Sequence, residues 1–113
     1  MIQIVRERLT PKEVEKFLGQ PFDSMIKFVA DVRQGILAFG GELHADAQAL
    51  LLENGSRQSD LWGANFHPKN TGPERVEFRS MINIRPSAGN PSNELRDPKI
   101  RMQVMEIVER LLP

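Results

Sequence analysis

Hydrophobic residues recur at two different spacings along this chain, and each change of spacing marks the boundary of a predicted element. An apolar run at 2–6 predicts an opening strand. The tetrapeptide at 10–13, Thr-Pro-Lys-Glu, is a capping-box pattern with proline at the first helical position, and it predicts a short helix. Apolar residues at helical spacing predict a second helix from about residue 22 to Gly35, which is placed to cap it.

After Gly35 the hydrophobic period changes to two, which is typical of β-strands. The predicted strands cover residues 36–43, 47–53, 61–67 and 75–85, of which the last shows the clearest alternation. Asn54-Gly55 is a strong turn signal between two of them. Asp97-Pro98 supplies an N-cap and a first-turn proline for a final amphipathic helix.

Strands joined by short turns and flanked by helices are typical of an α+β fold. We therefore predict one domain over residues 1–113, with a four- to five-stranded antiparallel meander sheet and helices packed on one of its faces. No internal repeat or low-complexity segment divides the chain.

Glu42, His44 and Asp46 occupy every second position next to the end of a predicted strand. In an extended strand all three side chains would project from one face, directly after the paired glycines at 40 and 41. Such a group could hold a metal ion, poise the histidine as an acid or base with a carboxylate to orient it, or form only a surface ion network. Asp46 could instead lie in the turn that follows. No established metal-binding spacing such as HExxH is present.

The alternation of the predicted strands also indicates which side chains share a face of the sheet. If Val76 and Phe78 pack under the helices together with Trp62, Phe66 and Phe39, their polar neighbours point the other way. This orientation collects a set of polar residues on one sheet face: Glu42, His44, Asn65, His67, Asn83 and Arg85. A shift of one residue in register would reverse a whole strand. Such a face either carries a binding site or is simply the solvated side of the sheet.

The end of the last predicted strand is a second candidate, because Arg85 is followed by a loop with hydrogen-bond donors. Ser87, Gly89 and Asn90 offer hydroxyl, main-chain and amide groups, and an arginine beside such a loop suits a carboxylate or phosphate. The same residue types also make ordinary turns, and Arg85 could pair with a nearby acidic residue.

The bulk composition narrows the function classes. Lys plus Arg and Asp plus Glu number 15 each, so the net charge is zero, which argues against a nucleic-acid binder because phosphate neutralisation needs an excess of basic residues. The chain has no cysteine, so a disulfide framework, a thiolate metal site and a thiol nucleophile are excluded. No apolar stretch has the length of a signal peptide or a membrane span, and the cytoplasm is the expected location.

Three strings of this sequence carry a family resemblance: Gly-Gly-Glu-Leu-His-Ala-Asp at 40–46, Asp-Leu-Trp-Gly at 60–63, and Ser-Met-Ile-Asn-Ile-Arg-Pro-Ser at 80–87 with the Gly-Asn pair that follows it. With them the chain resembles a small prokaryotic family of domains of unknown function, about 110 residues long. The resemblance covers nearly the whole chain and implies a self-contained domain. It implies no catalytic residue.

Two classes of function follow from these patterns. The first is a domain that binds a small anionic ligand or a metal, with a hydrolase as one form of it. Glu42, His44 and Arg85 are then the expected catalytic residues, and the expected ligand-binding residues are Asp46, Asn65, His67, Asn83, Ser87 and Asn90. The second class is a non-catalytic interaction module that forms a homodimer or docks a protein partner through an open sheet face. The patterns specify no cofactor and no metal ion.

Overall fold

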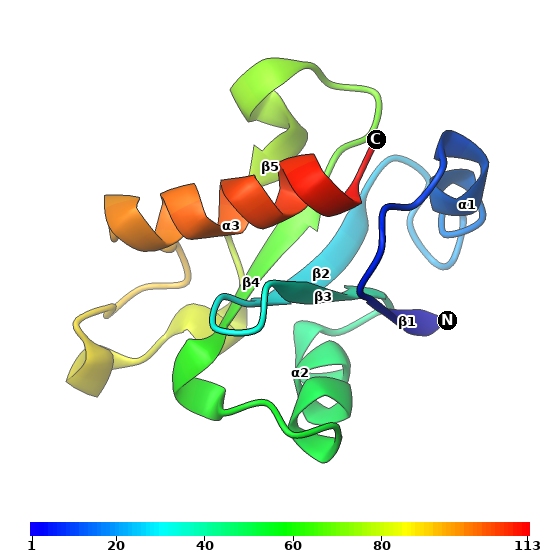
Figure 1. Ribbon diagram of the computed structural model, residues 1–113. Coiled ribbons are helices and arrows are strands. Elements are labelled where there is room, and N and C mark those ends of the chain that lie inside the picture. Colours follow the sequence, from blue (N-terminus) through cyan, green and yellow to red (C-terminus); the bar gives the residue numbers. More distant parts are fainter.

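A five-stranded antiparallel sheet runs through the middle of the molecule, with helices on both of its sides (Figure 1). The computed structural model describes all residues, 1–113. The strands are β1 (Ile2–Val5), β2 (Ile26–Asp31), β3 (Ile36–Gly40), β4 (Leu61–Phe66) and β5 (Val76–Glu77), and the α-helices are α1 (Pro11–Glu15), α2 (His44–Glu53) and α3 (Pro98–Leu111). The predicted α+β fold with an antiparallel sheet is therefore confirmed.

The order of strands across the sheet is β1-β3-β2-β4-β5, so β2 and not β3 occupies the centre. β2 and β3 form a hairpin, β1 pairs with the outer side of β3, and β4 pairs with the other side of β2. The predicted meander, in which each strand lies beside its neighbour in sequence, is therefore wrong at two connections: β1 lies beside β3 and not β2, and β4 lies beside β2 and not β3. Each of these two connections contains a helix, α1 or α2, so neither is a tight hairpin turn.

The two faces of the sheet carry two separate cores, so the expectation of helices on one face only is also wrong. In Figure 1, α3 lies above the sheet and α2 lies below it. Residues such as Phe28, Phe39 and Phe66 point to the α3 side and pack with Val108. Their neighbours along the strands point to the α2 side, where Val29, Ala38 and Leu61 pack against Ala47 and Leu51.

The second predicted helix does not form, because residues 26–31 are the central strand β2. This strand is covered on both faces, so Phe28, Val29 and Ala30 are apolar in succession and show no alternation. Buried strands and buried helices give the same apolar run over so short a stretch. The β-branched and aromatic residues of the segment favour the strand.

The predicted strand at 47–53 is likewise wrong, since these residues belong to α2. Ala and Leu dominate this segment and are among the best helix formers. Ala47 and Leu51, four positions apart, both lie on the buried side of the helix. The preceding strand ends at Gly40 rather than Leu43, because Gly40 and Gly41 have positive φ angles of 104° and 90° that turn the chain out of the sheet.

The predicted strand at 75–85 is correct only at its start, β5. The chain then leaves the sheet and forms a short 3₁₀-helix, η3 (Met81–Asn83), with Ser80 as its N-cap. A second one, η4 (Pro86–Ala88), follows.

The predicted starts of the first and last helices are confirmed in atomic detail. Glu13 N–H donates to Thr10 Oγ1 at 3.2 Å, and Thr10 N–H donates to Glu13 Oε1 at 3.0 Å, which is a complete capping box. Asp97 Oδ1 accepts from Lys99 N–H at the start of α3. The longest helix has 14 residues, and none combines the length and apolar composition of a bilayer span.

Candidate functional site

An open hollow of about 310 Å³ lies on the α2 side of the sheet, between the start of that helix and the segment that follows β5. Six polar side chains line it: Lys27, His44, Asn65, Arg79, Ser80 and Asn93. They come from β2, α2, β4 and the segments around η3, so residues distant in sequence meet in one place. No acidic residue lines the hollow.

The start of α2 faces this hollow. Leu43 is the N-cap residue and supplies no side-chain hydrogen bond, while His44 and Ala45 form the first turn and line the hollow with it. The first N–H groups of a helix have no partner within it, and the helix dipole makes this end positive. The start of α2 is therefore a favourable place for an anion.

His44 is fixed in one tautomer by the sheet beneath it. Its Nε2 lies 2.8 Å from the carbonyl oxygen of Ala64, which can only accept, so Nε2 carries a proton. In the neutral ring, Nδ1 is then an acceptor. Burial of the side chain lowers the pKa of His44, and the charge of Lys27 adds to this effect, while the hydrogen bond to Ala64 and the side chain of Asn65 oppose it. His44 is consequently a neutral base at neutral pH.

Asn65 has one end bound and the other free. Its Nδ2 donates to Glu77 Oε1 at 2.9 Å and to the carbonyl oxygen of Arg79 at 3.4 Å, so these two acceptors set the orientation of the amide. Its Oδ1 is buried and has no hydrogen-bond partner, and the residue as a whole is only 6% exposed. Buried polar atoms in proteins normally have a partner. This oxygen therefore marks a place where a donor is missing.

Asn65 also connects the hollow to His67 through Glu77. His67 Nε2 lies 3.6 Å from Glu77 Oε1, the same oxygen that Asn65 contacts. The hydrogen bond from Asn65 lowers the pKa of Glu77 against the opposing effect of burial, and His67 and Arg79 contribute in the same direction. Glu77 is therefore an anion outside the hollow that holds Asn65 in position.

Gly63 allows His44 and Ser80 to approach the sheet closely. A Cβ atom at this position would lie 2.6 Å from Ser80 Oγ and 3.2 Å from His44 Cδ2. The two side chains therefore pack side by side over the bare backbone of β4. Ser80 Oγ accepts from Ile82 N–H, and no hydrogen bond joins it to His44, so the pair does not form an activated serine nucleophile of the usual kind.

The alternating Glu42, His44 and Asp46 do not share a strand face, because His44 starts a helix. Glu42 and Asp46 are exposed, and neither lines the hollow. No group of three or more His, Cys, Asp or Glu side chains gathers anywhere in the molecule at metal-binding distance. The three residues thus fail to converge as the sequence pattern suggested.

Asn83 and Asn90 lie apart from the hollow and hold backbone segments together. Asn83 Oδ1 accepts from Gly63 N–H at 2.9 Å, and its Nδ2 donates to the Gly63 carbonyl at 3.0 Å. Asn90 Nδ2 donates to three carbonyl oxygens, and its Oδ1 accepts from Arg96 N–H. Both asparagines are buried with their hydrogen-bonding groups in use.

Arg85 is also occupied within the fold. Its guanidinium donates to the carbonyl oxygens of Gln58 and Leu61 and lies 3.8 Å from the centre of the Trp62 ring. Burial lowers the pKa of Arg85 from its ordinary value. Its Nε is buried without a partner, and Ser87, on η4, is exposed. Of the predicted site residues, the structure brings together His44, Asn65 and, through Glu77, His67.

The chain matches the family model described as protein of unknown function (DUF5674) over residues 3–111. It belongs to this family. No curated protein and no solved structure matches the chain. The resemblance to a family of domains of unknown function is thus confirmed, and membership in DUF5674 assigns no activity to the hollow.

Sequence reasoning missed four of the six polar residues of the lining: Lys27, Arg79, Ser80 and Asn93. Lys27 pairs with Asn65 across β2 and β4, so a correct strand over 26–31 would have placed it on the same face as Asn65. The signal was the β-branched, aromatic composition of that segment. Ser80 was treated as part of a strand, whereas Ser before a short apolar run is also a capping signal.

Proposed function

We propose that this protein binds a small anion in the hollow at the start of α2. The observation that carries the proposal is the charge of the lining: Lys27 and Arg79 face the hollow and no carboxylate does, although the chain as a whole has no net charge. The open N-terminus of α2 adds to the same positive potential.

The size and walls of the hollow support a small ligand. Its volume of about 310 Å³ is at the lower end of the range for ligand sites, which is about 300–1,000 Å³. Lys27 and Arg79 would hold the charge, and Ser80 and Asn93 are within the lining as further hydrogen-bonding groups. Leu43 and Met81, 58% and 73% exposed, stand at the rim as apolar surface for the rest of the ligand.

A thermal-shift experiment with sulfate and acetate tests the proposal, with chloride at equal ionic strength as the reference. We expect at least one of the two anions to raise the melting temperature of the wild type by several degrees, because a ligand at about 100 times its Kd adds about 2.7 kcal/mol of stability. Lys27→Met keeps the aliphatic stem and removes the charge, so it should lose most of this shift.

Lys99→Met is the matched control, because Lys99 is exposed on α3 and lies outside the hollow. This variant should keep the full shift. No shift in the wild type beyond that of chloride, or an equal shift in Lys27→Met, would contradict anion binding in the hollow.

The catalytic roles expected for Glu42 and Arg85 are not part of this proposal, since neither residue lines the hollow. The alternative of docking through an open sheet face has no such face at the central strands, because α2 and α3 cover β2 and β3 from opposite sides. A homodimer and a cytoplasmic location stay predictions from the sequence.

A further inference from the structure

Two acceptor atoms, Asn65 Oδ1 and His44 Nδ1, belong to residues that line the hollow. Asn65 Oδ1 is buried and has no donor. The Nδ2 group of Asn65 is bound to Glu77 and to the Arg79 carbonyl, and Asn65 and His44 line the same hollow. The side chain of Asn65 also raises the pKa of His44. Since Nε2–H donates to the Ala64 carbonyl, the other ring nitrogen of neutral His44, Nδ1, has a lone pair and no proton.

A protonated ring would add a donor to a hollow whose wall contains an unmatched acceptor. An imidazolium has two N–H donors, of which Nε2–H is held by the Ala64 carbonyl and Nδ1–H would be free for a ligand. Asn65 cannot turn its amide to offer a donor to neutral His44 without facing its oxygen toward Glu77 Oε1 and the Arg79 carbonyl. Asn65 therefore offers an acceptor and not a donor to the hollow that His44 also lines.

The charges around His44 keep that proton away in the empty hollow. Lys27 from β2 and Arg79 from the segment after β5 line the same hollow and are cationic. On the segment of His44 itself, Glu42 and Asp46 are exposed to solvent, where their charges are screened. Glu77 lies on the far side of Asn65, near His67. With His44 only 7% exposed, a third positive charge at this point is costly.

An anion in the hollow would reverse this balance. It would lie next to Lys27 and Arg79 and supply the negative charge that the imidazolium requires. We propose that the hollow binds its anion together with one proton, which is transferred from solvent or from the ligand's own acid group to His44 Nδ1. This inference rests on the proposed anion binding and adds that the bound species is an anion plus a proton.

The proposal assigns His44 as a positioning and charge-balancing residue of the site, and it makes affinity depend on pH. Between the pKa of His44 in the empty protein and its higher pKa in the complex, each unit of pH should weaken binding up to tenfold, because binding there is accompanied by the uptake of a proton. Outside this range the ring has the same protonation state in both forms, and the dependence should disappear.

Titration calorimetry with sulfate measures the number of protons directly, because sulfate keeps the same charge throughout the range from about pH 6 to 9. Binding is measured at pH 8 in two buffers with different ionisation enthalpies. We expect an uptake close to one proton per sulfate for the wild type. For His44→Gln, which keeps a polar side chain and cannot titrate, we expect an uptake close to zero.

Proton NMR of the ring signals provides a second readout that does not need a variant. The chain has two histidines, and His67 lies outside the hollow, so it is an internal control. Saturating sulfate should raise the pKa of His44 well above pH 8, as uptake of one proton per sulfate at pH 8 requires, and should shift the ring signals of His67 far less. Sulfate binding with no proton uptake and an unmoved His44 titration would overturn this inference and leave anion binding intact, whereas no binding of either anion would overturn both.

Discussion

At the scale of single residues, asparagine side chains take the place of main-chain pairing where the chain leaves the sheet. Asn83 meets Gly63 with one donor and one acceptor, the same pair of bonds that a neighbouring strand would provide. Asn90 then gathers the carbonyl oxygens of residues 83, 92 and 94. These contacts hold the segment after β5 against β4, and this segment contributes one wall of the hollow.

Replacing Asn83 by alanine should destabilise the protein strongly. Both main-chain groups of Gly63 would lose their partner in a site that is 0% exposed at Asn83, and each buried unpaired group costs about 1–3 kcal/mol. We expect a loss of about 2–4 kcal/mol in the free energy of unfolding, measured by urea denaturation. Ser87→Ala is the control, because Ser87 is exposed, and its midpoint should be unchanged. Equal midpoints for both variants would refute the structural role of Asn83.

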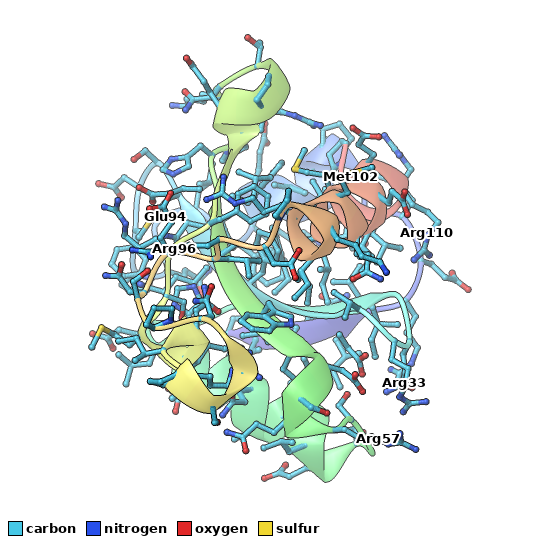
Figure 2. The ribbon with its side chains drawn as sticks, turned by 90° about the vertical axis from the view of Figure 1, so that its left-hand side faces the viewer. Arg33, Arg57, Glu94, Arg96, Met102 and Arg110 are labelled. Carbon is cyan, nitrogen blue, oxygen red and sulfur yellow. The ribbon has the colours of Figure 1, made fainter.

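At the scale of elements, the turn between β2 and β3 is organised by one buried carboxylate. Asp31 Oδ1 accepts from the N–H groups of Arg33 and Gln34, both at 2.9 Å. Its Oδ2 accepts from Ser56 Oγ at 2.7 Å and from Gln34 Nε2 at 2.8 Å, which ties the turn to the segment after α2. Arg110 of α3 donates to the Gly35 carbonyl, and Figure 2 shows Arg33 and Arg110 on the same side of the molecule.

Asp31→Asn should make the stability of the protein less sensitive to acid. Burial opposes ionisation of Asp31, but the hydrogen bonds from Ser56, Gln34 and Arg33 outweigh it and lower its pKa. A carboxyl whose pKa is lowered on folding stabilises the native state above its unfolded pKa, about 3.9, and this contribution is lost as the pH falls through the folded pKa.

The variant should therefore be less stable than the wild type by about 1–3 kcal/mol at pH 7, because the amide replaces one accepting carboxylate oxygen by an NH₂ group, which is itself a donor. This difference should shrink below about pH 4. Urea denaturation at pH 7 and pH 3 measures both values. A difference that stays constant between the two pH values would show that the charge of Asp31 does not contribute.

Some helices and strands could be predicted from the sequence and others could not. The helix starts at 10–13 and 97–98 could be predicted because an N-cap depends only on residues that contact each other within one turn. The residues of β2 were predicted as a helix and those of α2 as a strand. Hydrophobic periodicity identifies an element that is buried on one face, whereas β2 is buried on both faces. The run at 75–85 alternated beyond the end of β5, and the sequence did not reveal that a side chain, Asn83, would replace strand pairing there.

For the candidate site, the rule of alternating faces worked wherever the strand was correct. It placed Asn65 and His67 opposite the core residues of β4. His44 reaches the same side for another reason, because it starts α2 and is not part of a strand. It could not supply Lys27, because that requires the pairing of β2 with β4. It also could not show that Arg85 is occupied by backbone carbonyls and the Trp62 ring, since those partners follow from tertiary packing.

At the scale of the whole molecule, one sheet separates two cores of unequal size. The α3 side contains 19 buried residues, and the α2 side contains 6. Along each shared strand, alternate residues belong to the two cores. If one core unfolded, the opposite face of the strands that form the other core would be exposed to solvent. The smaller core carries α2, whose first turn forms the hollow. The binding site thus depends on the stability of the larger core.

We therefore expect both cores to unfold in a single transition. Leu51→Ala in the smaller core and Leu111→Ala in the larger one each remove a fully buried side chain and should each cost about 2–5 kcal/mol. Trp62, the single tryptophan, faces the larger core and reports on it by fluorescence, while far-UV circular dichroism reports on all helices. In urea the two signals should give the same midpoint for the wild type and for both variants. If α2 unfolded independently, Leu51→Ala would lower the midpoint seen by circular dichroism and leave that of Trp62 in place, and the hollow would then be a locally unstable part of the fold.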